Sequence, residues 1–485
     1  MTQIHELTVI ELAAAIRARD LSPVAVTDHY LRRTAELNEQ VGAFYTVTAE
    51  LAAEQALAAE KAVAQAVDPA DLPPLTGVPI PIKDLNMVAG VRQTLGSLAY
   101  ENNVPDTDDY TVTRLKDAGV VITGKTSTPE FGLPPYTETR IGPPARTPWD
   151  LSRSAGGSSG GAAAAVAAGL APAAQGSDGG GSIRIPASVN GLFGIKPSRG
   201  RVSKGPLDPD LEGLSTNGPI ARTVADAALL LDVMSGNYPG DMYTLPPLPP
   251  GESFLGYARR PPGRLKIGRT LQNPVDGADV HPDCVAAYEE ASALLASLGH
   301  EVEDITMPFG PDVIPFFETL WYVHATVVPL APEQEDTMLP LTAYLRARGQ
   351  AVTAPELFFA QAYLQFITRE ALGTLNAYDV ILNPTLAQPP RPVGYFDEVD
   401  PPENFERQKR FAPFPALYNV RPAGRERAAV LERRGPADRR DAGRPDGRRG
   451  HPDLPVRPAR GGPSLEGPAP AAVGSARIVA APAWS

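Results

Sequence analysis

The sequence predicts an α/β fold built around one central mixed β-sheet. Segments with apolar residues at helical spacing alternate with short apolar segments bounded by turn residues, which is the pattern of strands alternating with helices. The chain has 485 residues, of which 43% are hydrophobic, so it can bury a sizeable core. We find no internal repeat that would indicate a repeat architecture instead.

Helices are expected first. Residues 8–19 carry apolar residues at helical spacing. Ser22 and Pro23 then provide an N-cap and a proline in the first turn, so a second helix should begin there and extend to about residue 39. A third helix, rich in Ala and Glu, is expected over residues 48–66.

The alternation of strands and helices follows these helices. Strands are expected at 76–84, 120–123, 265–270, 300–305 and 378–382, and helices at 108–118, 159–169, 223–236 and 282–298. Residues 237–262 are rich in Pro and Gly, and we interpret them as a long surface loop within one domain rather than a linker.

Composition excludes several classes of function. The formal net charge of −12 argues against nucleic acid or an anionic membrane as the main partner. The chain has one cysteine, so no intrachain disulfide can form, which is typical of a reducing compartment. The first 50 residues lack a signal pattern, and no apolar run is long enough to cross a bilayer. A soluble cytoplasmic protein is therefore expected.

The last 65 residues have a different composition. Residues 421–485 contain 13 Arg, no Lys, 10 Pro and 7 acidic residues, and apolar periodicity stops there. Such a segment should not build a packed core, so we predict that it is disordered.

The segment most informative about chemistry is 156–188, which contains two glycine runs. The second run, Gly179, Gly180 and Gly181, leads directly into Ser182. Consecutive glycines can turn their N–H groups toward one point, as an oxyanion hole requires, and the serine that follows is a natural nucleophile. The alternative is that the glycines only form tight turns. Nucleotide binding is disfavoured because neither phosphate-binding fingerprint is present.

A base is needed to activate Ser182. None of the six histidines lies beside a serine motif, so a Ser-His-Asp triad is disfavoured. Lys83 ends an apolar strand, and burial would lower its pKa enough for it to act as a base. The alternative is an ordinary ion pair with the adjacent Asp84, which would be favoured if Lys83 were considered alone.

Taken together, these motifs resemble the amidase signature family. Ser158 lies in G-G-S-S-G-G and Ser182 in G-G-S-I-R-I-P-A-S, 24 positions later, as the family's relay serine and nucleophile do. Lys83 lies upstream in G-V-P-x-x-x-K-D. The resemblance extends from about residue 6 to residue 420, and further matching segments are 124–132, 190–197 and 218–222.

The resemblance implies a fold and a site. The fold would be a central mixed, twisted sheet covered by helices on both faces. Lys83 would be the base, Ser158 the relay next to a cis peptide, and Ser182 the nucleophile. The backbone N–H groups of Gly179, Gly180, Gly181 and Ser182 would form the oxyanion hole. Supporting roles fall to Ser159, Asp178 and Arg184, for which a purely structural role is an equal alternative. No metal or cofactor is required.

The predicted domain ends where the resemblance stops. Residues 1–420 would form an amidase-signature domain, with N-terminal helices (1–70), a catalytic core (71–235) and a variable region (237–400). A one-base shift of the codons from Val420 to Arg448 can encode the ending that the family would have here. We therefore predict that the aberrant tail, 421–485, arises from a frameshift near Val420.

The expected function is hydrolysis of a linear or cyclic amide C–N bond through a covalent acyl-enzyme, in an amidase that is not a peptidase. The alternatives are a glutamine-hydrolysing amidotransferase subunit and an inactive relic caused by the altered C-terminus. The partner would be a small-molecule amide, and a homodimer is left open. Residues 316–328 are aromatic and could line an apolar pocket, although plain core is favoured. Segments near residues 206 and 240 are similar to the branch that hydrolyses the 6-aminohexanoate cyclic dimer.

Overall fold

Three helices begin the chain, as the sequence predicts. They are α1 (Val9–Arg17), α2 (Pro23–Val41) and α3 (Ala49–Gln65). The predicted start at Ser22 is confirmed, because its hydroxyl accepts a hydrogen bond from the N–H of Ala25 at 3.2 Å and Pro23 occupies the first turn of α2. The structure, a computed structural model, describes residues 3–208 and 213–420. The predicted tail lies outside the described residues, so its frameshift and disorder stay predictions.

The prediction of one central sheet is wrong. The described strands form three separate three-stranded sheets. The first has the order β1 (Phe44–Val47), β3 (Gly124–Thr126), β2 (Ile82–Lys83); the second has the order β4 (Ala173–Asp178), β6 (Thr216–Ala221), β5 (Phe193–Gly194); the third has the order β8 (Glu301–Asp304), β7 (Lys266–Arg269), β9 (Val380–Leu382).

Prolines and one side chain explain why the first two sheets do not merge. Pro79 and Pro81 have no N–H to donate, so the strand expected over residues 76–84 is reduced to β2. The N–H of Gln175 in β4 still donates to the carbonyl of Pro81 at 3.2 Å. The next amide, Lys83 N–H, donates instead to the side-chain oxygen of Gln175 at 2.9 Å. A side chain thus takes the place of a backbone hydrogen bond between the sheets.

The second sheet has a helix on each face. Successive strand residues point to opposite faces. Ala173 and Ala221 belong to the same core cluster as the side chains of α7 (Val224–Met234), while Ala174 and Ile220 belong to that of α5 (Gly160–Ala167). Every residue of α5 is buried, which its Gly and Ala composition permits because neighbouring backbone can approach closely.

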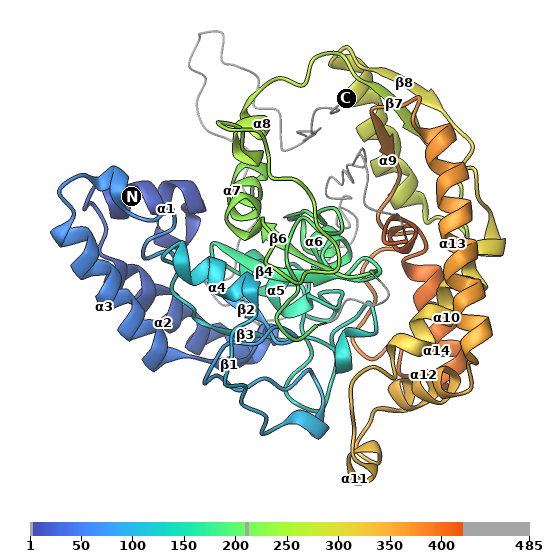
Figure 1. Ribbon diagram of the computed structural model, residues 1–485, viewed down its shortest axis with the longest axis horizontal. Coiled ribbons are helices and arrows are strands. Elements are labelled where there is room, and N and C mark those ends of the chain that lie inside the picture. Colours follow the sequence, from blue (N-terminus) through green and yellow to red (C-terminus); the bar gives the residue numbers. More distant parts are fainter. Residues whose placement is uncertain (1–2, 209–212, 421–485) are drawn as a thin grey trace, which may run out of the picture.

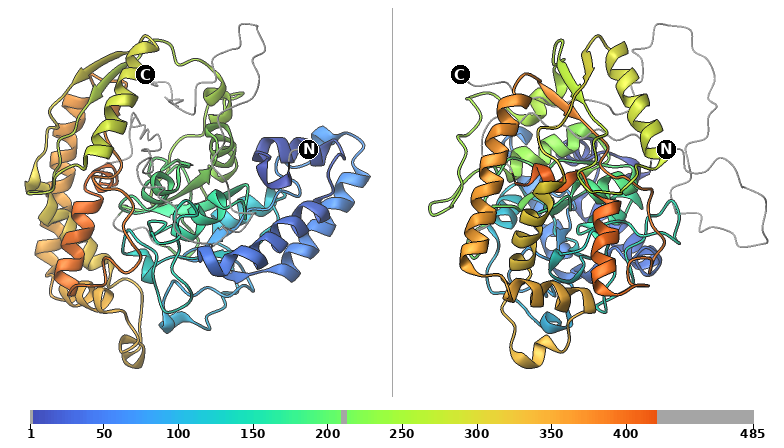
Figure 2. Two further views of the ribbon diagram at one scale, coloured as in Figure 1. Left: turned by 180° about the vertical axis from the view of Figure 1, so that it is seen from behind. Right: turned by 90° about the vertical axis from the view of Figure 1, so that its right-hand side faces the viewer.

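The remaining helices surround these sheets. They are α4 (Tyr110–Asp117), α6 (Arg184–Asn190), α8 (Phe254–Arg259), α9 (Pro282–Ser297), α10 (Ile314–His324), α11 (Pro332–Glu335), α12 (Pro340–Gln350), α13 (Ala354–Leu375) and α14 (Pro401–Phe411). Only α8 interrupts the predicted loop at 237–262. Figure 1 shows α1–α3 on one side of the strands β1–β4 and β6, and α10, α12, α13 and α14 on the other side, and Figure 2 agrees from behind. None of the helices described is both long and apolar enough to cross a membrane.

Candidate active site

Lys83 ends β2 and is completely buried. Its Nζ lies 2.7 Å from Ser158 Oγ, 3.0 Å from Ser177 Oγ and 3.3 Å from the Ser177 carbonyl oxygen. These three contacts fill the hydrogen-bonding capacity of a neutral amine, which has two N–H donors and one lone pair. The structure therefore brings together Lys83 and Ser158, two of the three residues predicted to be catalytic.

The charge state of Lys83 depends on its surroundings. Burial lowers the pKa of Lys83 to about 7, although the carboxylate of Asp178 acts in the opposite direction. Asp84, the alternative ion-pair partner, instead contacts Lys125, with 2.9 Å between Oδ1 and Nζ. Its other oxygen accepts hydrogen bonds from the N–H and the hydroxyl of Thr94 at 2.8 and 2.5 Å. Both oxygens of Asp84 thus have partners other than Lys83.

Ser158 and Ser159 stand at the start of α5, next to Ser182. The peptide bond between Gly157 and Ser158 is cis. The Ser159 N–H donates to the Ser182 carbonyl at 3.1 Å, which holds the two serine segments together. The Ser182 side chain is largely buried, and its hydroxyl makes no hydrogen bond to another described residue. The segments that carry Ser158 and Ser182 are therefore in contact through the backbone, but the two hydroxyls are not hydrogen-bonded to each other.

The glycine run follows directly after β4. Within residues 3–208 and 213–420, the N–H groups of Gly179, Gly180 and Ser182 donate to no protein acceptor. The fourth predicted donor, Gly181, is occupied, since its N–H donates to Asp178 Oδ1 at 2.8 Å. Gly181 has φ +128°, and a Cβ there would lie 2.7 Å from both Ile185 Cδ1 and Pro415 Cβ, so only glycine fits. Three free donors remain in this loop.

Asp178 and Arg184 form a buried ion pair beneath the glycine run. Arg184 Nη2 lies 2.8 Å and Nε 2.9 Å from the carboxylate oxygens of Asp178. Burial acts to raise the pKa of Asp178, but the Arg184 guanidinium, together with Lys196 and the Asn419 amide, holds this pKa well below its usual range. Asp178 also accepts from the Ile183 N–H at 3.1 Å. The carboxylate thereby fixes the curvature of the loop that carries Ser182.

The last described segment closes onto this ion pair. Arg184 donates to the carbonyl of Pro415 at 2.9 Å and to Asn419 Oδ1 at 2.6 Å. The Asn419 amide in turn donates to Asp178 Oδ1 at 2.9 Å. Residues up to Asn419 thus belong to the support of the site, and the aberrant composition begins two positions later.

Three residues of this site were missed from the sequence: Ser177, Lys125 and Asn419. Ser177 lies between Gly176 and Asp178 in the glycine-rich segment, where attention fell on the later serine. Lys125 lies in a segment that carried the family resemblance but had no assigned chemistry. Asn419 gave no signal, because its contact with Asp178 joins residues more than 200 positions apart.

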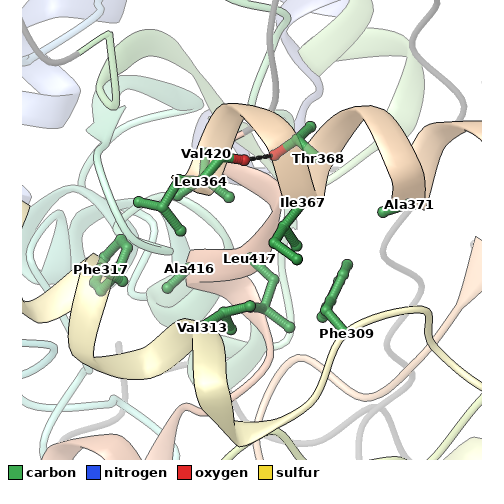
Figure 3. Close-up of a pocket in the computed structure, with 10 residues that line it drawn as sticks. All are labelled: Phe309, Val313, Phe317, Leu364, Ile367, Thr368, Ala371, Ala416, Leu417 and Val420. Carbon is green, nitrogen blue, oxygen red and sulfur yellow. Dashed lines mark hydrogen bonds between the residues drawn. The ribbon is translucent and has the colours of Figure 1, made fainter. Parts of the chain in front are cut away.

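Aromatic side chains of α10 lie beside the glycine run. A Cβ added to Gly180 would lie 3.6 Å from both Phe317 Cζ and Trp321. Phe317 also lines an apolar pocket between α10, α13 and the turn at Pro415–Tyr418 (Figure 3). Its one polar lining residue, Thr368, donates its hydroxyl to the Leu364 carbonyl at 2.6 Å. Residues of the aromatic segment 316–328 therefore belong to a core cluster and also lie beside the glycine run.

No group of three or more His, Cys, Asp or Glu residues in the described ranges is arranged to hold a metal ion.

Comparison with known proteins gives consistent matches. Residues 25–431 match the family model described as Amidase. A protein of Synechocystis sp. described as "Putative amidase" is 38% identical over 406 residues, which cover 83% of this chain and 78% of that protein.

Solved structures agree with the sequence matches. A 6-aminohexanoate cyclic dimer hydrolase complexed with substrate superposes with a TM-score of 0.78 and 28% identity, covering 88% of this chain and 91% of that chain. A bacterial aryl acylamidase of the amidase signature family superposes with a TM-score of 0.74 and 26% identity, covering 81% and 82%.

Proposed function

Because the chain belongs to the amidase signature family of hydrolases, we propose that it cleaves a carboxylic amide C–N bond with Ser182 as nucleophile, Ser158 as relay and Lys83 as base. The observation that carries this proposal is the contact between Lys83 Nζ and Ser158 Oγ at 2.7 Å, inside the protein and without a carboxylate bonded to the amine. An amine in this environment is a base near neutral pH.

The reaction would proceed in two stages. Neutral Lys83 takes the proton of Ser158, which takes that of Ser182 as the Ser182 oxygen attacks the amide carbonyl carbon. The N–H groups of Gly179, Gly180 and Ser182 are the proposed donors to the resulting oxyanion. The proton returns through Ser158 to the leaving nitrogen, and the C–N bond breaks. Water then hydrolyses the acyl-enzyme along the same relay.

Two observations support this assignment of proton donors and acceptors. The two hydrogens of a neutral Lys83 amine can donate to Ser177 Oγ and to the Ser177 carbonyl, which leaves the lone pair for the proton of Ser158. The Ser182 hydroxyl has no competing partner among the described residues, so it is available to Ser158 and to a substrate.

The substrate is proposed to have an apolar part. Phe317 and Trp321 face the glycine run that would bind the carbonyl oxygen, so a group attached near that carbonyl would contact aromatic surface. Two similar solved structures support a small amide as substrate: one is a 6-aminohexanoate cyclic dimer hydrolase and the other is an aryl acylamidase. We propose that the chain takes a small linear or cyclic amide.

A serine-directed fluorophosphonate probe tests the nucleophile. We expect labelling at Ser182, its loss in Ser182→Ala, and normal labelling in Ser188→Ala, a partly exposed serine on α6. Labelling of Ser182→Ala at the normal rate would refute the assignment.

A panel of aliphatic, aryl and cyclic amides together with glutamine tests the substrate class. Hydrolysis of one of the small amides that is lost in Ser182→Ala is the expected result. Hydrolysis of glutamine alone would favour an amidotransferase subunit, and no hydrolysis by a protein that the probe labels would contradict the proposed substrate class.

A further inference from the structure

The strand that carries Lys83 is very short and is held from both sides. It consists of Ile82 and Lys83 and pairs in parallel with β3, where the Asp84 N–H donates to the Thr126 carbonyl at 3.1 Å. On the other side lies β4, whose Gln175 accepts the Lys83 N–H through its side-chain Oε1 at 2.9 Å. Both Gln175 and Lys83 are completely buried. The main-chain N–H of Lys83 is therefore held by a side chain and not by the backbone of a strand.

The amine end of Lys83 is held by the same strand. Residues two apart in a strand point to the same face, as Gln175 and Ser177 do in β4. Ser177 Oγ lies 3.0 Å from Lys83 Nζ, and Ser158 Oγ lies 2.7 Å from it. Gln175 thus contacts the main chain of Lys83 and Ser177 contacts its amine. The direction in which the amine reaches Ser158 depends on where that main chain is held.

The orientation of the Gln175 amide is determined by its neighbours. Its Nε2 donates to Asn86 Oδ1 at 2.9 Å and to Asn217 Oδ1 at 3.2 Å. The Asn86 amide nitrogen in turn donates to Asp109 Oδ2 at 2.8 Å. Burial raises the pKa of Asp109 to about 6, so at pH 7 this carboxylate is ionised and can only accept. A chain of donors from Gln175 to Asp109 therefore leaves Oε1, the acceptor, facing Lys83.

We propose that Gln175 is a positioning residue for the hydrolytic reaction: it holds the main chain of Lys83 so that the amine meets Ser158. This inference rests on the proposed role of Lys83 as base. Gln175 takes no part in the proton transfers and acts only through Lys83. A displacement of a reacting group by about 1 Å can lower a rate on the order of 100-fold. A contact that only joined the two sheets would change stability without changing the rate of the folded protein.

The test is a double-mutant cycle on the rate of fluorophosphonate labelling, measured on the full chain. Gln175→Met, which keeps the size of the side chain but cannot accept the Lys83 N–H, is made in the wild type and in Lys83→Met. We expect the maximal labelling rate to fall about 10- to 100-fold in the wild-type background and less than about twofold in the Lys83→Met background, where no base is left to position. The probe concentration at half the maximal rate should stay the same, because Gln175 acts on the base and not on the bound probe.

Thr111→Val is the matched control. The buried Thr111 hydroxyl accepts from the Asn217 amide at 3.0 Å and donates to the Ser203 carbonyl at 3.0 Å, and neither contact involves Lys83. Loss of this hydroxyl should lower the free energy of unfolding in urea titrations and leave the labelling rate within about twofold of the wild type.

Three results would overturn the inference. One is an equal fall in labelling in both backgrounds, because Gln175 would then not act through the base. Another is a folded Gln175→Met protein that labels at the wild-type rate. If Gln175→Met does not fold, Gln175→Asn, whose amide is one methylene too short to reach Lys83, is measured in its place. Loss of folding in both variants is the third, because the contact would then be needed for folding itself. Failure of the proposed function would look different, since Lys83→Met alone would then label normally.

Discussion

The second and third sheets differ in how their charged side chains are paired and how far these are exposed to solvent. In the sheet β4–β6–β5, nearly all residues of β4 and β6 are buried. The carboxylate of Asp178, at the end of β4, forms a buried ion pair with Arg184. In the sheet β8–β7–β9, Arg269 is shared between Glu289 at 2.6 Å and Asp304 at 2.9 Å, and the Asp304 side chain is 79% exposed. A lost partner can be replaced by water or another carboxylate in the third sheet but not in the second. A reaction that depends on a neutral buried amine therefore needs the neighbouring carboxylate to have a fixed partner of its own, as Asp178 has in Arg184.

The largest effect should come from removing the proposed base. Lys83→Met keeps the length and apolar stem of the side chain but has no lone pair to accept the Ser158 proton. We expect amide hydrolysis and Ser182 labelling to fall on the order of 10⁴-fold or more, with folding retained. Lys61→Met, at an exposed position on α3, is the control. A loss of less than tenfold in a folded Lys83→Met protein would show that another group is the base.

The comparison of the two sheets is tested directly by neutralising one carboxylate in each. Asp178→Asn leaves Arg184 buried without a counter-ion, so we expect the free energy of unfolding to fall by about 3–5 kcal/mol in urea titrations. Asp304→Asn removes one partner of a solvated ion pair, so a loss below about 1 kcal/mol is expected. Equal losses in the two variants would remove the distinction drawn between the sheets.

The backbone of the glycine run can be tested in the same way. Gly181→Ala places a Cβ against Ile185 and Pro415 at φ +128°, so we expect a loss of about 1–3 kcal/mol in the free energy of unfolding. Gly180→Ala is the matched control, because its Cβ would make only ordinary contacts with Phe317 and Trp321. If Gly180→Ala were the more destabilising, steric fit at Gly181 would not be what fixes the loop.

A pH response is also expected of the wild type. Lys83 has a pKa of about 7 in the folded chain and an ordinary value of 10.5, so labelling should fall about tenfold per pH unit below 7 and level off above it. Between these two values the unfolded chain binds more protons than the folded chain. This lysine should therefore make the free energy of unfolding rise from pH 7 to 10.5 and leave it unchanged below 7.

Urea titrations of wild type and Lys83→Met at several pH values measure this contribution as the difference between the two slopes. Equal slopes would mean that Lys83 keeps its ordinary pKa in the fold.

The sequence by itself determined where helices start and which loop residues are candidates for catalysis. Ser22 with Pro23 and Thr223 are local signals: each N-cap hydroxyl accepts from an amide three residues later, so no distant contact is needed. The motifs around Ser158 and Ser182 likewise identified the family, because glycine and serine recur there at the family's own spacing. The prolines that shorten β2 were visible, but their consequence for the sheet was not.

Only the tertiary structure decided which charges meet. Whether Asp84 belongs to Lys83 or to Lys125 depends on the parallel pairing of β2 with β3, and strand pairing is a long-range choice that adjacent residues do not encode. The same holds for Asn419, whose contact with Asp178 closes a loop of 241 residues. The side chain of Gln175 between two sheets is a third case. Local sequence thus specified the candidate reactive groups, while packing over long distances paired Asp84 with Lys125 and Asp178 with Arg184 and left the Lys83 amine without a bonded carboxylate.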